Sequence, residues 1–268
     1  MFGNFAVADI IAYYISKIDN KCRSELRRGI ITSERDYVTA LSTRIRDEIN
    51  IQLQLNCHSQ TVRPRVENEN GVDGIIIFKC ADEVKIGLFE AKRPQITINN
   101  YGWDYLSSRN MSHFSEQIKN QHKWINEIAL FEIFFNEGID GYLSPPFEYF
   151  GSSCIWHNNA YQFMHKENLI FNSWTTDKLK KILEKNSVSI YSVIFDIISC
   201  KQGKKHKIDM AKQSVNIISD QNKEIIFEIP LPFENEDIQE DKRILDFLNQ
   251  NNIENYTFIN LDKMEKRI

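Results

Sequence analysis

An aspartate and a Glu-Ala-Lys sequence stand at the ends of two apolar segments in the first third of the chain. Asp73 opens the segment 71–78, and Glu90 and Lys92 lie at the end of the segment 84–91. Side chains alternate along a strand, so Glu90 and Lys92 point to the same face. A hairpin between the two segments would place Asp73 beside them. The sequence therefore predicts two carboxylates and one ammonium group at one end of a hairpin.

Two carboxylates beside a lysine suit a hard divalent cation. Mg²⁺ prefers one or two protein carboxylates together with water and phosphate oxygens. We therefore expect Asp73 and Glu90 to bind Mg²⁺, or Mn²⁺ in its place, with the backbone carbonyl of Ala91 as a further metal ligand. Lys92 would orient or deprotonate the attacking water, or stabilise the charge of the transition state. This pattern predicts metal-dependent hydrolysis.

The arrangement resembles the PD-(D/E)XK nuclease superfamily, which has the restriction-endonuclease-like fold. The match consists of Val72-Asp73, sixteen intervening residues and Glu90-Ala91-Lys92, and Val72 replaces the proline of the motif. The resemblance covers about residues 33–137. It implies an Mg²⁺-dependent endonuclease that hydrolyses DNA phosphodiester bonds, in bacterial or phage restriction and antiviral defence. It also implies that Glu34 is a further catalytic and metal-binding residue.

Some branches of the superfamily carry a polar residue on the helix that follows the motif, and Gln117 and Gln121 match that position. These glutamines would contact the substrate or support the metal ligands. The alternative is that they lie on one solvated face of the helix.

Each acidic residue of the motif also has a structural explanation. Asp73 precedes a glycine, and Asp-Gly is a common turn dipeptide. Glu90 and Lys92 could form an exposed pair on an edge strand, which hinders aggregation. Glu34 would be favoured by the helix dipole alone if it lies in the first turn of a helix.

The elements that position these residues follow an α/β pattern. We expect helices at residues 7–18, from Thr32 or Ser33 onward, and at 112–137, 175–185 and 236–249. We expect strands at 51–55, 71–78, 84–91, 152–157, 161–165, 224–229 and 256–260. Asn158-Asn159 would form a tight turn between the strands 152–157 and 161–165. The predicted fold is α/β, a restriction-endonuclease-like mixed central sheet flanked by helices, with a C-terminal α/β extension. Residues 1–150 would form the nuclease core with its N-terminal helices. Residues 151–268 would extend the core for substrate recognition or oligomerisation, or belong to the same single domain.

Charge is distributed unevenly along a chain whose formal net charge is −4 over 268 residues. A lysine-rich stretch runs from Lys201 to Lys212. The predicted DNA contacts within it are Lys201, Lys204, Lys205 and Lys207, and the alternative is that the stretch is a solvated loop. Acidic residues dominate residues 224–246. Because the two stretches can lie on different faces, a negative net charge does not exclude DNA as a partner.

Several classes of protein do not fit the sequence. Its five cysteines form no C-x-x-C pair, which predicts free thiols in the reducing cytoplasm. No apolar run is long enough for a membrane span, and neither a signal peptide nor an H-E-x-x-H zinc motif is recognisable. No phosphate-binding loop of an NTPase occurs, so an NTPase or sensor partner would be a separate protein. The predicted partners are DNA and a second copy of this chain. The alternatives are a non-catalytic nucleic-acid-binding or assembly subunit, and an RNase.

Overall fold

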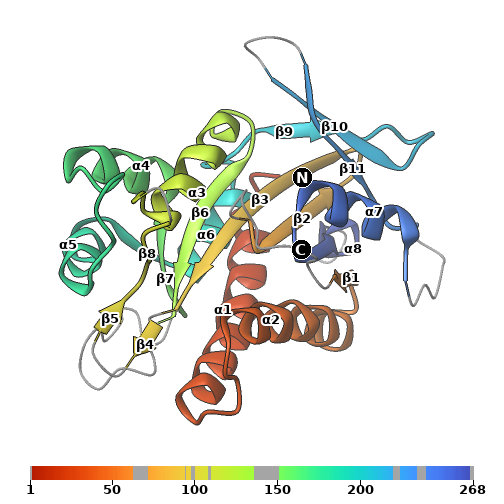
Figure 1. The fold of residues 1–268 in the computed structure, drawn as a ribbon. Helices are drawn as coiled ribbons and strands as arrows, with labels where there is room; N and C mark the ends of the chain where they lie inside the picture. The colour runs from red at the N-terminus through yellow and green to blue at the C-terminus, as the bar shows by residue number, and fades with distance from the viewer. Residues whose placement is uncertain are drawn as a thin grey trace.

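A mixed sheet forms the centre of the computed structural model. The model describes residues 2–62, 72–93, 95–97, 100–107, 110–135, 151–219, 224–233 and 240–265. The strand order of the sheet is β1-β12-β2-β3-β6-β7-β8, and β9 also pairs with β3 (Figure 1). The strands are β1 (Asn56–Thr61), β2 (Gly74–Cys80), β3 (Glu83–Lys92), β6 (Ala129–Phe134), β7 (Ser153–Trp156), β8 (Ser187–Ser189), β9 (Lys205–Lys207) and β12 (Asn255–Asn260). Two neighbouring pairs, β12–β2 and β3–β6, are parallel, and the others are antiparallel. The predicted mixed α/β sheet is confirmed.

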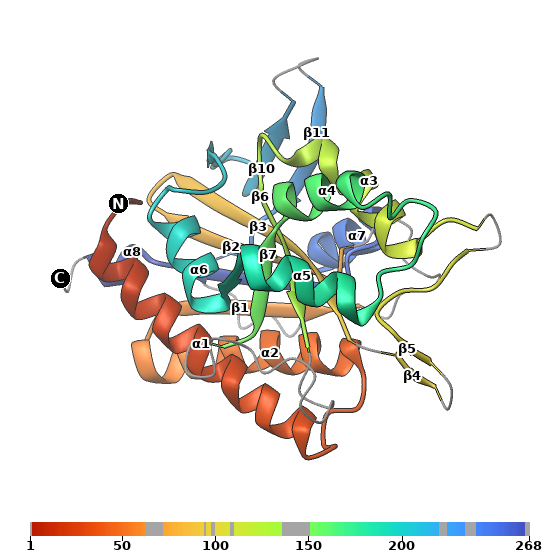
Figure 2. The same ribbon diagram turned by 90° about the vertical axis from the view of Figure 1, so that its left-hand side faces the viewer.

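Helices cover both faces of this sheet. The helices α1 (Phe5–Arg27), α2 (Glu34–Glu48) and α6 (Ile190–Ile198) share one apolar core with Phe89, Ala91 and other residues of β3 and β6. Figures 1 and 2 show α1 and α2 together on this side of the sheet. Because the strands alternate, Leu88 and the next residue on its face, Glu90, point to the opposite side.

The opposite side of the sheet is covered in two parts. The helices α3 (His113–Gln121), α4 (His157–Lys166) and α5 (Thr176–Asn186) pack over β6 and β7. The hairpin of β10 (Ser214–Ile218) and β11 (Ile225–Pro230) packs with α7 (Lys242–Asn251) over β2, β3 and β12. The remaining elements are short: the hairpin of β4 (Gln95–Thr97) and β5 (Asn100–Gly102), and α8 (Asp262–Glu265). Glu90 therefore lies between two apolar cores.

The predicted hairpin of β2 and β3 is confirmed. Its register pairs Gly74 with Phe89 at one end and Cys80 with Glu83 at the other. β2 is buried along its whole length, as its continuous apolar sequence predicts for a central strand. The Phe89 ring lies so close to Gly74 that a Cβ there would be 2.3 Å from its Cζ. Glycine at this position therefore lets the two strands pair next to Asp73.

Three predicted elements differ from the structure in type or extent. The predicted helix 112–137 ends at Gln121. A 3₁₀ turn follows to Trp124, and β6 occupies 129–134. Residues 136–137 lie outside the described residues. Residues 158–165, predicted as a turn and a strand, belong to α4. The predicted strand 51–55 is mostly a π-helical turn, which Gln54 ends in the left-handed conformation before β1 begins.

Strands from the C-terminal part of the chain belong to the same sheet as the N-terminal hairpin. β7, β8, β9 and β12 all come after residue 151. The predicted domain boundary at residue 150 lies outside the described residues. Residues 236–239 of the predicted helix 236–249 also lie outside them. Among the described helices, none combines the length and the apolar character that crossing a membrane requires.

Candidate metal centre

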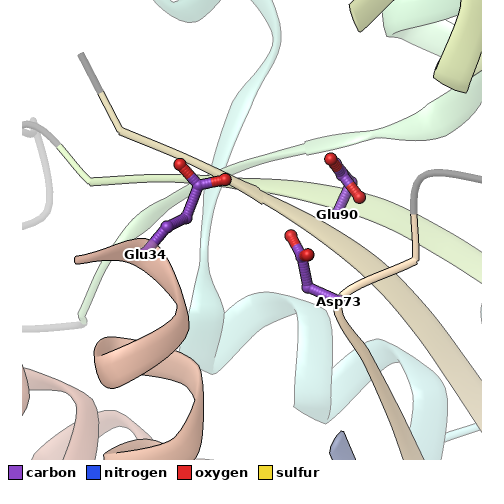
Figure 3. Close-up of side chains that lie close together, drawn as sticks. All are labelled: Glu34, Asp73 and Glu90. Atoms are coloured by element: carbon purple, nitrogen blue, oxygen red, sulfur yellow. The ribbon is translucent and has the colours of Figure 1, made fainter. Parts of the chain in front are cut away.

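Three carboxylates from three elements converge at one end of the hairpin. One carboxylate oxygen each from Glu34, Asp73 and Glu90 lies within 4.8 Å of the others. Glu34 is the first residue of α2, Asp73 directly precedes β2, and Glu90 lies near the end of β3. Figure 3 shows the three side chains reaching the same region from these elements. The structure thus brings together the acids that the sequence singled out.

Glu34 is held by the start of its helix and by the chain after β3. The side chain of Ser33 caps α2 by accepting a hydrogen bond of 3.0 Å from the N–H of Asp36. The Arg93 N–H donates to Glu34 Oε2 at 2.8 Å. The predicted helix start is confirmed. Glu34 does more than complement the helix dipole, because its carboxylate reaches across to the end of β3.

Asp73 is fixed by both of its neighbouring strands. Its N–H donates to the carbonyl oxygen of Phe89 at 3.0 Å, and its own carbonyl accepts from the Asn255 N–H at 3.1 Å. Its Oδ2 accepts the Ala91 N–H at 2.6 Å. These contacts place Asp73 in the sheet and not in an isolated turn. Ala91 thus reaches the cluster through its amide, and a role of its carbonyl as a metal ligand stays a prediction.

Glu90 and Lys92 form a buried ion pair on one face of β3. Lys92 Nζ donates to Glu90 Oε1 and lies 3.8 Å from Glu34 Oε1. The ammonium group also lies 5.3 Å from the centre of the Phe114 ring of α3. Because β3 is a central strand and Glu90 is 1% exposed, the alternative of an exposed edge-strand pair is wrong.

The cluster shifts the pKa values of its own groups. Burial raises the pKa of Glu34 and of Glu90 to about 7, although Lys92 acts in the other direction on both. Burial and the charge of Glu90 raise the pKa of Asp73 well above its usual value. Burial would lower the pKa of Lys92, but the three carboxylates outweigh burial and raise it overall. Lys92 therefore keeps its proton at neutral pH.

The donor set fits a hard divalent cation. Three carboxyl groups face one ammonium group, so the cluster carries excess negative charge in a largely buried place once its acids are ionised. Glu90 Oε2 is buried and has no hydrogen-bond partner among the described residues, so it is a free ligand atom. The cluster Glu34, Asp73 and Glu90 contains neither imidazole nor thiol, and an all-oxygen set suits Mg²⁺ or Mn²⁺ better than Zn²⁺.

The two glutamines of α3 lie on its buried face. Gln117 and Gln121 are both buried, so the alternative of a solvated helix face is wrong. Gln117 follows Phe114, which contacts Lys92, by one turn of the helix. Gln117 Oε1 has no hydrogen-bond partner among the described residues. A role of these glutamines toward the substrate stays a prediction.

The structure does not bring the lysine-rich stretch to the acidic cluster. Each predicted DNA-contacting lysine forms an ion pair: Lys201 with Asp196, Lys204 with Glu127, Lys205 with Glu83, and Lys207 with Asp82. β9 pairs with the start of β3, where Lys207 stands opposite Glu83. Glu83 is seven residues before Glu90 on β3, which corresponds to roughly 23 Å along a strand. These lysines lie beside the hairpin turn, at the opposite end of the sheet.

Sequence reasoning missed two buried polar residues beside this cluster. Glu132 of β6 stands opposite Glu90 of β3, and His157 Nδ1 lies 2.8 Å from Glu132 Oε1. Both were assigned to the wrong type of element, Glu132 to a helix and His157 to the end of a strand. The signal for Glu132 was the segment 129–134, in which one acid interrupts an apolar run as Glu90 does in β3.

Comparison with known proteins identifies no relative. No protein-family model matches the chain, and neither a curated protein nor a solved structure matches it. A function for this chain must therefore be argued from its own residues. The geometry that carries the argument is the convergence of Glu34, Asp73, Glu90 and Lys92.

Proposed function

We propose that this protein is an Mg²⁺-dependent nuclease of the PD-(D/E)XK type that hydrolyses phosphodiester bonds of DNA. The observation that carries the proposal is that Asp73, Glu90 and Lys92, which match the motif, meet Glu34 at one end of the β2–β3 hairpin. A role in restriction or antiviral defence follows from the resemblance alone and belongs to the same proposal.

The acidic residues would bind the cation. Asp73 and Glu90 would be its principal ligands, with Glu34 as the third carboxylate. A bound Mg²⁺ supplies Lewis-acid chemistry, because it polarises a phosphate and lowers the pKa of water. The Ala91 N–H holds one oxygen of Asp73, which leaves the other oxygen of that carboxylate available as a ligand.

Lys92 would stabilise charge. Its ammonium group is held by Glu90 and lies close to Glu34, and these acids raise its pKa. A lysine that keeps its proton cannot deprotonate water at neutral pH. Of the roles expected from the sequence, the contacts therefore favour orienting the attacking water and stabilising the negative charge of the phosphoryl transition state.

Cleavage of a supercoiled plasmid tests the proposal. Wild-type protein should cut in Mg²⁺ or Mn²⁺ and lose this activity in EDTA. Asp73→Asn and Lys92→Ala should each lower the cleavage rate by at least about 100-fold. Lys205→Ala is the matched control, because it removes a lysine from an ion pair at the far end of the sheet, and it should cut like wild type.

The same experiment separates the alternative functions. Equal cleavage by wild type, Asp73→Asn and Lys92→Ala would refute the proposal. Retention of DNA without metal-dependent cleavage would identify a non-catalytic binding or assembly subunit. Metal-dependent cleavage of an RNA panel, with DNA left intact, would identify an RNase.

A further inference from the structure

A second buried acid lies beside Glu90 on the neighbouring strand. β3 and β6 run parallel with Glu90 opposite Glu132, so the two side chains point to the same face of the sheet. Neither residue is more than 1% exposed. The preceding pair on this face, Leu88 and Leu130, is apolar and buried. An acidic pair therefore interrupts an otherwise apolar layer next to the candidate metal centre.

His157 holds Glu132 from the other side. Its Nδ1 lies 2.8 Å from Glu132 Oε1, and both side chains are fully buried. Toward an ionised carboxylate, which only accepts hydrogen bonds, Nδ1 would carry the proton and donate it. His157 is the first residue of α4 and directly follows β7, whose Ile155 is paired with Glu132. The fold thus fixes the imidazole and the carboxylate relative to each other.

A purely structural role does not explain this pair. Glu132 Oε2, Glu90 Oε2 and His157 Nε2 are buried and have no hydrogen-bond partner among the described residues. Each buried polar atom without a partner costs free energy, and apolar residues of similar volume would avoid this cost. Two carboxylate oxygens without donors on adjacent strands fit a site that also holds a cation.

We infer that Glu132, oriented by His157, is a positioning residue that strengthens divalent-cation binding by Glu34, Asp73 and Glu90. The inference rests on the proposed function, because it requires a cation at that cluster. Glu132 acts without touching the ion: its carboxylate adds negative charge behind Glu90, where burial weakens solvent screening. Groups that support metal ligands by hydrogen bonds change metal affinity by about 10- to 100-fold, and we expect the effect of the Glu132 charge at the lower end of this range.

Calorimetric titration of the full chain with Mn²⁺ tests the inference without relying on cleavage. Glu132→Gln keeps the shape and removes the charge, so its dissociation constant should rise about tenfold or more. His157→Leu removes the donor to Glu132 and should have a similar effect. His157→Asn keeps a side-chain N–H donor and should stay within about threefold of wild type. Adding His157→Leu to Glu132→Gln should change nothing further, because His157 acts through Glu132.

Two controls make the result specific. Glu127→Gln removes another buried acid, which lies just before β6 in the sequence and forms an ion pair with Lys204. This variant should bind Mn²⁺ like wild type. Asp73→Asn should abolish binding. If Asp73→Asn abolishes binding and Glu132→Gln stays within twofold of wild type, the inference is wrong and the proposed function stands. If Asp73→Asn binds Mn²⁺ like wild type, both are wrong.

Circular dichroism before each titration shows whether a variant is folded. If Glu132→Gln does not fold, the comparison of His157→Leu with His157→Asn decides the question. Equal affinities of these two variants would refute the inference, and restored affinity in His157→Asn would support it.

Discussion

The acidic cluster should make the cation-free protein less stable as the pH rises, and Glu90 is the residue with which to test this. Its pKa is about 7 in the folded protein, against an ordinary value of 4.5. A carboxyl group with a raised pKa binds more protons in the folded than in the unfolded state between these values. Its contribution to stability is therefore fully present below pH 4.5 and is lost as the pH rises to 7. The difference corresponds to about 3 kcal/mol.

Thermal unfolding in EDTA, compared between wild type and Glu90→Gln, measures this loss. About 2 kcal/mol of it falls between pH 5.5 and 8, which for a chain of this size corresponds to roughly 4–8 °C in Tm. The difference in Tm, Glu90→Gln minus wild type, should therefore increase by roughly 4–8 °C between pH 5.5 and pH 8. The attraction of Lys92 for the ionised Glu90 is already contained in the Glu90 pKa of about 7, and the raised pKa of Lys92 keeps the lysine itself protonated throughout.

A control and a metal titration complete the experiment. Asp82→Asn changes an exposed acid at the turn of the same hairpin, whose pKa is lowered by Lys207, so its Tm difference from wild type should stay constant above pH 5.5. Mg²⁺ should stabilise wild type more at pH 8 than at pH 5.5, because it competes with protons for the carboxylates. A Tm difference between Glu90→Gln and wild type that does not vary with pH would refute the reasoning.

Three further predictions follow from the fold and the charge distribution. Gly74→Ala should lower the free energy of unfolding by about 1–3 kcal/mol in urea, because its Cβ would meet the Phe89 ring; an unchanged urea midpoint would contradict the close approach of the strands. Lys207→Ala should change that free energy by less than about 1 kcal/mol and leave DNA cleavage unchanged, because it removes an exposed ion pair; slower cleavage would place DNA at the far end of the sheet. Lys92→Ala should bind a DNA oligonucleotide more tightly in Mg²⁺ than in EDTA, as measured by fluorescence anisotropy. Equal affinity under the two conditions would show that the acidic cluster does not face the phosphates.

The hairpin and its acids could be predicted because local sequence determines them. Two apolar segments with strand composition flank a short turn, and period-two alternation places Glu90 and Lys92 on one face. Ser33 marks the start of α2 because its side chain can cap the helix. The approach of Glu34 to Asp73 depends on how α2 packs on the sheet, and only the resemblance to the superfamily predicted it.

β6 could not be recognised in the same way because its neighbours in sequence favour a helix. Ser112 is a helix cap, and the polar and apolar residues after it continue with helical spacing. The strand forms because the segment 129–134 pairs with β3, which is more than 30 residues away in the sequence. For α4, the dipeptide 158–159 suggested a turn. The buried residues His157, Ala160 and Met164 have helical spacing. This spacing predicts the observed helix better than the dipeptide does.

The negative net charge is compatible with a nuclease because the charges are segregated along β3. At the start of this strand, Lys205 and Lys207 are neutralised by acids of the hairpin turn, so they offer little free charge to a phosphate. At its end, three carboxyl groups outnumber the ammonium group of Lys92, and in their ionised form they would repel a phosphate. A cation at that end would therefore serve two purposes: it would supply the chemistry of hydrolysis, and it would reverse the local charge so that a DNA backbone can approach.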